Sequence, residues 1–282
     1  MTAFERAAII GLGLVGGSVA RDLAAQGVEV VAYDSDPSQL EAAVREGVVQ
    51  HALAADLSGV GGVELILVAV PVDTAADVLR LVAPYAAAAR LITDVGSTKA
   101  RIVDAAISTG LGDRFIGSHP MAGDHRSGWR ASRAGLFRNA RVYLCPANPS
   151  STRLTSLAES FWQDLGALPV VLSAARHDQT LAWTSQLPHL LSTALALALA
   201  RSGLTRDDLG PGGRDVTRLA GSSPDVWTPI VRDNATAIET ALAAVEKEIA
   251  HIRGALIRRD EADLRKHFSA ARAWFLASER NS

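Results

Sequence analysis

The chain has 282 residues, of which 48% are hydrophobic and 21% charged, and its formal net charge is -2. This composition is typical of a globular protein with a sizeable core, and the near balance of charges excludes a basic surface for nucleic acid or an anionic membrane. The single cysteine, Cys145, excludes an internal disulfide and a cysteine-rich zinc site. The N-terminus lacks the layout of a signal peptide, and the longest apolar run, residues 190–200, is too short to span a bilayer, so we expect a soluble cytoplasmic protein.

Short runs rich in β-branched residues alternate with Ala- and Leu-rich helical segments through the first 173 residues. Several of these runs are apolar at almost every position, which is typical of strands that helices cover on both faces. The alternation predicts an α/β fold that begins with a doubly wound, Rossmann-like and mostly parallel sheet. The predicted strands span residues 6–11, 28–34, 63–71, 90–96, 115–119, 141–146 and 168–173.

After residue 173 the sequence predicts helices only. We expect a long helix that is interrupted or kinked at Pro188, then a glycine-rich turn and short helices within residues 210–227. Residues 230–278 are predicted to be nearly continuous helix. The chain therefore divides into an α/β domain, residues 1–173, and an all-helical domain, residues 174–282. The apolar run 190–200 suits an interface with a second copy, so we expect a homodimer through the helical domain.

The segment GLGLVGGS carries a Gly-x-Gly-x-x-Gly pattern directly after the first predicted strand and at the start of a helix. In this setting Gly11 permits a tight turn, Gly13 lets a pyrophosphate approach the backbone, and Gly16 lets the helix pack closely on the strand. The free N–H groups of the helix N-terminus attract phosphate. The pattern predicts a dinucleotide site, and the competing interpretation is a turn that binds nothing. The loop residues predicted to bind the cofactor are Gly11, Leu12, Gly13, Leu14, Val15 and Gly16.

Two further strand ends are predicted to contact this cofactor. Asp34 ends the second strand, where a carboxylate accepts hydrogen bonds from the ribose hydroxyls and repels a 2′-phosphate, so we expect NAD and regard NADP as the poorer cofactor. The competing role for Asp34 is to cap the helix that follows. Val70 and Pro71 end the predicted strand 63–71, beside the expected nicotinamide ribose, although Pro71 also suits a simple end to the strand.

His119 lies at the end of the predicted strand 115–119, at the edge of the sheet where ligands bind in such folds. Oxidation of an alcohol requires a base for the hydroxyl proton, and an imidazole suits that role at neutral pH. A structural histidine and a metal ligand are the alternatives. A metal site would need Asp124 and His125 as further ligands, and no cysteine or paired carboxylate completes a set, so we predict no metal and a loop position for His125.

Ser97 and Lys99 follow the predicted strand 90–96 and precede a helix. Ser97 is either the N-cap of that helix or a hydroxyl of the site, and both roles are compatible if Thr98 takes over the capping. Lys99 is interpreted as a possible partner of a surface acid.

Five segments, GLGLVGGS, DVGSTK, SHPMAG, QLPH and GGRDVTRLAGSSPDVW, occur in this order over residues 6–275. Together they resemble the prephenate/arogenate dehydrogenases of tyrosine biosynthesis. The resemblance implies an NAD-dependent oxidative decarboxylation of prephenate to 4-hydroxyphenylpyruvate, or of arogenate to tyrosine, with hydride passing from ring C4 to NAD. It also implies that His119 is the catalytic histidine that binds the ring 4-hydroxyl, and that Ser97 binds the same hydroxyl or that histidine.

The same resemblance implies roles in the helical domain, which becomes the substrate and dimerisation domain. Arg218 is similar to the arginine that binds a substrate carboxylate, and Asp215 is placed to orient it. Ser185, His189 and Trp227 are expected to line the pocket around the substrate side chain. From the residues alone, Arg218 is equally compatible with an exposed cation, and His189 and Trp227 with core positions.

Two other functions fit parts of the sequence. A β-hydroxyacid dehydrogenase shares the two-domain plan but relies on a catalytic lysine in the helical domain, where Lys247 and Lys266 lie in strongly charged helices. A non-catalytic NAD-binding sensor would keep the three glycines without needing His119, Ser97 and Arg218 together.

Overall fold

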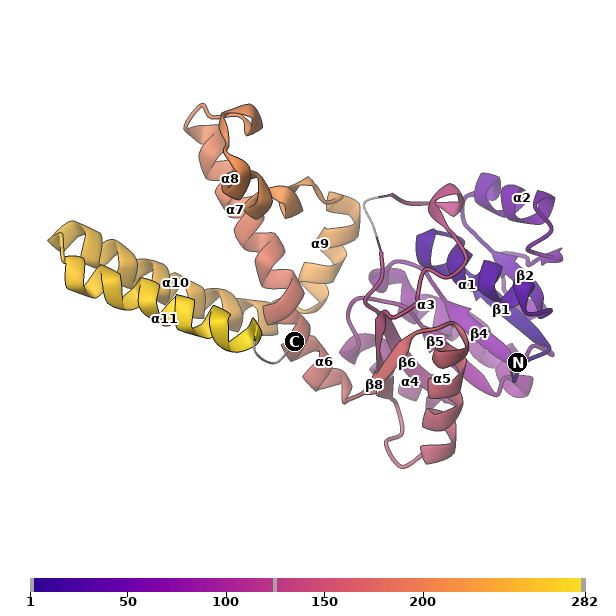
Figure 1. The fold of residues 1–282 in the computed structure, drawn as a ribbon. Coiled ribbons are helices and arrows are strands. Elements are labelled where there is room, and N and C mark those ends of the chain that lie inside the picture. Colours follow the sequence, from indigo (N-terminus) through magenta and orange to yellow (C-terminus); the bar gives the residue numbers. More distant parts are fainter. Residues whose placement is uncertain (1–2, 124–125, 280–282) are drawn as a thin grey trace. The chain divides into compact units, whose positions relative to one another are not determined.

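An eight-stranded sheet forms the N-terminal part of the computed structural model, which describes residues 3–123 and 126–279 (Figure 1). The strands are β1 (Arg6–Ile10), β2 (Glu29–Tyr33), β3 (His51–Ala52), β4 (Leu65–Val68), β5 (Leu91–Asp94), β6 (Phe115–Pro120), β7 (Arg141–Pro146) and β8 (Leu168–Val171). Their order is β3-β2-β1-β4-β5-β6-β7-β8. The strands up to β6 are parallel, whereas β7 pairs antiparallel with β6 and parallel with β8. The predicted mostly parallel sheet is confirmed, and only the two-residue strand β3 was not expected.

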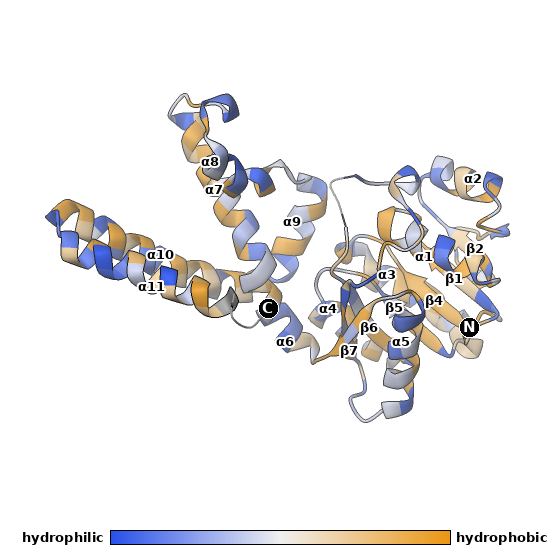
Figure 2. Ribbon diagram, viewed as in Figure 1, coloured by the Kyte–Doolittle hydropathy of each residue, from blue (hydrophilic) through white to orange (hydrophobic). Residues whose placement is uncertain are grey.

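Helices cover both faces of the sheet because neighbouring residues of each strand point to opposite faces. On one face lie α1 (Leu14–Ala25), α2 (Pro37–Arg45) and α5 (Thr152–Asp164), and on the other lie α3 (Val72–Val82) and α4 (Ala100–Ser108). Each face of the sheet has its own hydrophobic core. In β1, Ala7 and Ile9 pack in the core beneath α1, α2 and α5, and Ala8 and Ile10 pack in the core beneath α3 and α4. Figure 2 shows β4 in the hydrophobic colours, as expected for a strand buried on both faces.

The sheet changes winding direction between β1 and β4, which are neighbours although the chain passes through β2 and β3 between them. In doubly wound sheets the ligand crevice lies beyond the carboxyl ends of the strands at this point. The glycine-rich loop follows β1, and Val70 and Pro71 follow β4, so both predicted cofactor segments lie at that edge.

The first helices after the sheet are α6 (Ala174–Leu181), α7 (Leu187–Arg201), α8 (Pro211–Val216) and α9 (Pro224–Asp233). The predicted interruption of the first long helix does not lie at Pro188 itself. A π-helical turn, Ala182–Gln186, comes just before it, and Pro188 lies in the first turn of α7. Because proline has no N–H to donate to the carbonyl of residue 184, the helix loses a regular bond one turn upstream, which fits a wider turn at that place.

The chain divides into two compact units, one up to Asn234 and one from Ala235 onward. The second unit is a hairpin of α10 (Ala235–Arg258) and α11 (Glu261–Glu279). The prediction of nearly continuous helix is confirmed, with short breaks at Asn234 and at residues 259–260. At the second break Arg259 takes a left-handed conformation with φ of 54° and reverses the chain. A functional boundary at residues 173–174 stays a prediction. No helix of the described ranges is long and apolar enough to cross a membrane.

Candidate active site

The glycine-rich loop is shaped by two close approaches and one open position. Gly11 has φ of +98°, and a β-carbon on it would lie 2.3 Å from the carbonyl oxygen of Ala69. A β-carbon on Gly16 would lie 2.0 Å from the carbonyl oxygen of Gly11, so α1 approaches the strand end as closely as glycine allows. A β-carbon on Gly13 would meet no atom within 4 Å. The loop thus combines a glycine-dependent turn with free space over Gly13 (the place expected for a pyrophosphate).

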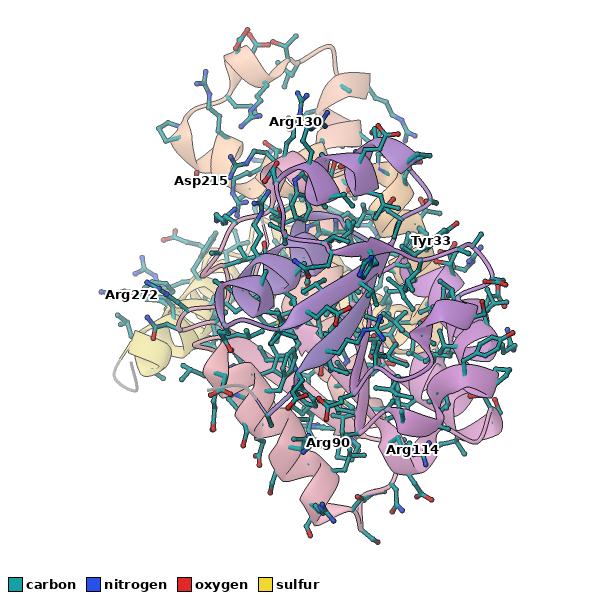
Figure 3. The ribbon with its side chains drawn as sticks, turned by 90° about the vertical axis from the view of Figure 1, so that its right-hand side faces the viewer. Tyr33, Arg90, Arg114, Arg130, Asp215 and Arg272 are labelled. Carbon is teal, nitrogen blue, oxygen red and sulfur yellow. The ribbon has the colours of Figure 1, made fainter. Side chains whose placement is uncertain are left out.

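The N-terminus of α1 and the end of β2 complete this edge. Gly13 is the N-cap of α1, and no side chain caps the helix. One carboxylate oxygen of Asp34 accepts a hydrogen bond from Leu12 N at 2.6 Å, and the other accepts from Asp36 N at 2.8 Å. The cap of α2 is Asp36, which accepts from Ser38 N, so the capping role considered for Asp34 is wrong. The side chain of Asp34 instead binds the backbone of the glycine-rich loop. Figure 3 labels Tyr33, the residue before it.

The end of β4 lies against the same loop. A β-carbon on Gly11 would lie 3.3 Å from Cγ1 of Val70, and Pro71 is the N-cap of α3. Val70 is half-buried and Pro71 exposed. Both positions are therefore available to a ligand over the loop. The role of Pro71 as the end of the strand is wrong, because β4 ends at Val68 and Pro71 precedes α3.

His119 lies near the carboxyl end of β6, and its side chain is largely buried, with the residue 9% exposed. Its Nδ1 is 2.9 Å from Nε2 of His177, and the two rings meet edge to face with centroids 5.1 Å apart. Nδ1 of His177 in turn lies 2.7 Å from Oδ1 of Asp178. A chain of three polar side chains, His119–His177–Asp178, therefore runs from β6 into α6.

Asp178 also determines how α4 begins. Its Oδ1 accepts from Lys99 N and its Oδ2 from Ala100 N, each at 2.8 Å. These bonds cap the helix, so the N-cap role considered for Ser97 and the capping role considered for Thr98 are both wrong. The Thr98 hydroxyl donates to Asp233 instead. Within the described ranges the half-buried Ser97 hydroxyl has no hydrogen-bond partner, which leaves it free for a ligand.

Beneath these groups lies a buried ion pair. Nζ of Lys99 donates to Oδ2 of Asp94, and both side chains are almost completely buried. Asp94 also accepts from Gly96 N and from Ser118 N. The interpretation of Lys99 as a surface residue is wrong, because its stem is packed over Gly117 of β6 and its charge is neutralised inside the protein.

The surroundings favour neutral histidines. Burial holds the pKa of His119 well below its ordinary value, and the neighbouring His177 and Lys99 lower it further. Burial also lowers the pKa of His177, against the opposing effect of its hydrogen bond to Asp178. An unprotonated His119 is the form in which an imidazole accepts a proton.

A second cluster joins three predicted residues of the helical segment. The imidazole of His189 stacks on the indole of Trp227, with centroids 3.4 Å apart and planes 23° apart. Nδ1 of His189 lies 3.0 Å from the carbonyl oxygen of Ser185, at the π-helical turn. Burial is the main cause that lowers the pKa of His189, and the nearby Arg218 adds to it. Arg218 is exposed, so its guanidinium is accessible.

Comparison with known proteins identifies the family of the chain. Residues 19–171 match the family described as prephenate dehydrogenase, nucleotide-binding domain, and residues 173–270 match prephenate dehydrogenase, dimerization domain. The chain belongs to the prephenate dehydrogenase family. Among curated relatives, the prephenate dehydrogenase of Bacillus subtilis is 32% identical over 94% of this chain and 73% of the relative. The cyclohexadienyl dehydrogenase of Zymomonas mobilis is 30% identical over 98% and 97%.

Solved structures of this family superimpose closely. A prephenate dehydrogenase from A. aeolicus, in complex with hydroxyphenyl propionate and NAD+, has a TM-score of 0.88 at 26% identity, covering 97% of this chain and 98% of its own. An arogenate dehydrogenase from Synechocystis has a TM-score of 0.81 at 27% identity, covering 95% and 98%. Like those relatives, this member of the prephenate dehydrogenase family is an oxidoreductase.

Some predicted site residues of this family member are not brought together. Asp215 is exposed on α8 (Figure 3), and in the part of the chain that the structure describes no hydrogen bond or ion pair joins it to Arg218. Asp124 and His125 lie outside the described residues. Among the described residues, the one group close enough to share a metal ion is Glu248, His251 and His267, which does not include His119.

Four buried groups next to His119 were not predicted: His177, Asp178, Lys99 and Asp94. His177 is 58 positions from His119, and no spacing rule connects a strand end to the start of a distant helix. The only signal in the sequence is the adjacent histidine and aspartate in the polar first part of α6. Lys99 was noted in the sequence because it follows Ser97 by two residues. Its burial could not be predicted, because it depends on the tertiary contact with Asp94.

Proposed function

We propose that this chain catalyses the NAD-dependent oxidative decarboxylation of prephenate to 4-hydroxyphenylpyruvate, or of arogenate to tyrosine, with His119 as the base. The observation that carries the proposal is a largely buried histidine whose pKa lies well below its ordinary value, at the carboxyl end of β6. The names of the relatives, prephenate, cyclohexadienyl and arogenate dehydrogenase, support the substrate class.

The chemistry requires little more than alignment and one base. His119 removes the proton of the ring 4-hydroxyl, so that a carbonyl forms at ring C4. When bound, NAD supplies the acceptor for the hydride of that carbon. Loss of the ring carboxylate as CO2 then restores aromaticity. The free hydroxyl of Ser97 is suited to hold the substrate hydroxyl or His119 in place.

The glycine loop fits a dinucleotide. The space over Gly13 and the uncapped N-terminus of α1 suit a pyrophosphate, since helix N–H groups stabilise negative charge. The carboxylate of Asp34 suits ribose hydroxyls and repels a 2′-phosphate, which favours NAD over NADP. The residues assigned to the cofactor are Gly11, Leu12, Gly13, Leu14, Val15, Gly16, Asp34, Val70 and Pro71.

The second cluster suits a dianionic substrate. Arg218 offers a fork of N–H donors to a carboxylate, and the stacked pair of His189 and Trp227 offers a flat wall beside it. Ser185 fixes His189 through its carbonyl. Asp215 does not bind Arg218 in the described chain. To orient Arg218, the segment 211–221, which carries both residues, must move when substrate binds.

We assign residues 1–173 to the cofactor and residues 174–282 to substrate binding and homodimerisation. Large apolar side chains are exposed on the second unit, among them Ile257 and Phe268, at 76% and 75%. Leu195 and Leu197 of α7 are exposed as well, within the apolar run 190–200. A second copy of the chain that covers these side chains explains why they are exposed in one copy. The match to a dimerization domain supports that partner.

The test is the formation of reduced nicotinamide with prephenate, arogenate and a 3-hydroxyacid in parallel, each with NAD and with NADP. We expect turnover of at least one cyclohexadienol with NAD and none of the 3-hydroxyacid. Turnover of the 3-hydroxyacid alone would favour a β-hydroxyacid dehydrogenase, although Lys247 and Lys266 are both exposed in the described chain. NAD binding without any turnover would favour a sensor.

A further inference from the structure

We infer that His177 is a positioning residue that holds His119 in the proton-accepting tautomer, with Asp178 as its anchor, and then shares the proton that His119 receives. The inference deepens the proposed function and rests on it. It starts from the chain His119–His177–Asp178, whose two contacts measure 2.9 and 2.7 Å.

The direction of each hydrogen bond follows from the end of the chain. A carboxylate only accepts hydrogen bonds, and Asp178 already accepts from Lys99 N and Ala100 N. Nδ1 of His177 therefore carries a hydrogen and donates it to Asp178. Nε2 of the neutral His177 ring then has only a lone pair, so Nδ1 of His119 must donate to it. This leaves the lone pair of neutral His119 on Nε2, the nitrogen that can take a proton from a substrate.

The packing holds this arrangement in place. His177 is completely buried, and the ring of Tyr143 lies edge-on against it with centroids 5.5 Å apart. Asp178 is fixed from both sides, because it caps α4 and its backbone carbonyl accepts from Nδ2 of Asn234. Because His177 is completely buried and lies in hydrogen-bond distance of Nδ1 of His119, the tautomer of His119 depends on His177.

The charges around the two rings determine which ring holds a positive charge better. Lys99 opposes a proton on either histidine, whereas Asp178 and Asp94 favour one on His177. For His119, each contributing group lowers the pKa. Tyr143 and Cys145 on β7 are the other titratable groups nearby, and burial raises the pKa of Cys145 to about 12, so its thiol stays uncharged.

The proton transfer can therefore continue by one step. When Nε2 of His119 gains the substrate proton, the N–H bond at Nδ1 of His119 breaks and an N–H bond forms at Nε2 of His177. His119 is then neutral with its hydrogen on Nε2, and His177 is an imidazolium beside the carboxylate of Asp178. The number of protons is unchanged, and the positive charge now lies on the ring that is hydrogen-bonded to the carboxylate of Asp178.

The experiment compares His177→Asn and His177→Phe with wild type, using His51→Asn as a matched control at an exposed position. Asparagine keeps an acceptor for His119 but cannot take a proton, and phenylalanine keeps the ring volume but no acceptor. We expect kcat for the cyclohexadienol to fall about 10- to 100-fold in His177→Asn and further in His177→Phe, with NAD affinity unchanged. The acidic limb of the kcat/KM profile should move to lower pH, most in His177→Phe, because the Nδ1–H of a protonated His119 loses the acceptor that stabilises its charge.

A second readout needs neither turnover nor a variant. In wild type with ¹⁵N-labelled histidine, NMR should show His119 protonated at Nδ1 and not at Nε2. A pH limb that stays in place while kcat falls, or a His119 that carries its hydrogen on Nε2, would overturn the inference. Failure of wild type to turn over any cyclohexadienol would instead contradict the proposed function, and the tautomer measurement would remain a separate result.

Discussion

Lys99 donates a hydrogen bond from Nζ to Oδ2 of Asp94, and this ion pair lies inside the protein with side-chain exposures of 0% and 1%. The pair connects Asp94, the last residue of β5, to Lys99, the residue that precedes α4. The stem of Lys99 packs on Gly117 of β6. Each charge has lost its water and depends on the other.

Lys99→Met should therefore destabilise the fold strongly. The substitution keeps most of the volume but leaves the buried carboxylate of Asp94 without its cation, which costs about 3–5 kcal/mol. Urea unfolding measures the difference. Lys247→Met, at an exposed position on α10, is the control and should change the free energy of unfolding by less than about 0.5 kcal/mol. Equal effects of the two substitutions would contradict the role of the pair.

Gly13 and Gly16 should respond differently to alanine. Gly13→Ala places its methyl group in open space, so the fold should keep its stability while the KM for NAD rises about tenfold, the equivalent of ~1.4 kcal/mol. Gly16→Ala places a β-carbon 2.0 Å from the Gly11 carbonyl oxygen and should lower the free energy of unfolding by about 1–3 kcal/mol. The two variants are compared by urea unfolding and by KM for NAD. The reverse pattern would argue against a phosphate over Gly13.

Arg218→Ala should raise the KM for the dianionic substrate. Loss of a hydrogen bond to a charged group costs about 1.5–3 kcal/mol, so kcat/KM should fall roughly 10- to 100-fold, with KM for NAD unchanged. Arg218→Lys should recover only part of the loss, because an ammonium cannot bind a carboxylate as a fork. Arg214→Ala is the control, since Arg214 is exposed and donates to the carbonyl of Leu209. An effect on NAD binding alone would refute the placement of Arg218.

The stability of the fold should depend on pH through His119. Its pKa in the folded chain lies well below the ordinary value of 6.5, so in acid the unfolded chain binds a proton that the folded chain does not. The contribution is complete above pH 6.5 and is lost as the pH falls toward the folded pKa, by up to about 1.4 kcal/mol per pH unit. Urea unfolding at about pH 7.5 and about pH 5.5 should show a smaller loss for His119→Asn than for wild type. Parallel curves would mean that His119 titrates normally in the folded chain.

Local patterns were sufficient to predict the sheet and to single out several residues of the candidate site. β-Branched runs that are apolar on both faces located β1, β2 and β4 to β8, and the glycine pattern located the tight approach at Gly11 and Gly16. His119 and Ser97 were singled out because one ends a predicted strand and the other follows one, and such strand ends meet at one edge of a parallel sheet. The stack of His189 on Trp227 also joins two residues singled out in advance.

The remaining features depend on tertiary contacts. Asp178 caps α4 from a different helix, so no local rule pointed away from Ser97 as the N-cap. Lys99 is charged and follows a strand, a position that is typical of surface residues. Its burial depends on the ion pair with Asp94, which the sequence does not indicate. Arg259 reverses the chain in a left-handed conformation that ordinarily favours glycine, and the sequence has no glycine there.

The role of His119 is tested most directly by kcat for prephenate in His119→Asn against wild type, with NAD affinity measured on the same preparations. Asparagine retains a polar side chain of similar size but cannot accept the hydroxyl proton. We expect kcat to fall about 10²-fold or more while NAD binds as in wild type, and His51→Asn to remain at the wild-type rate. An unchanged kcat in His119→Asn would remove this histidine from catalysis.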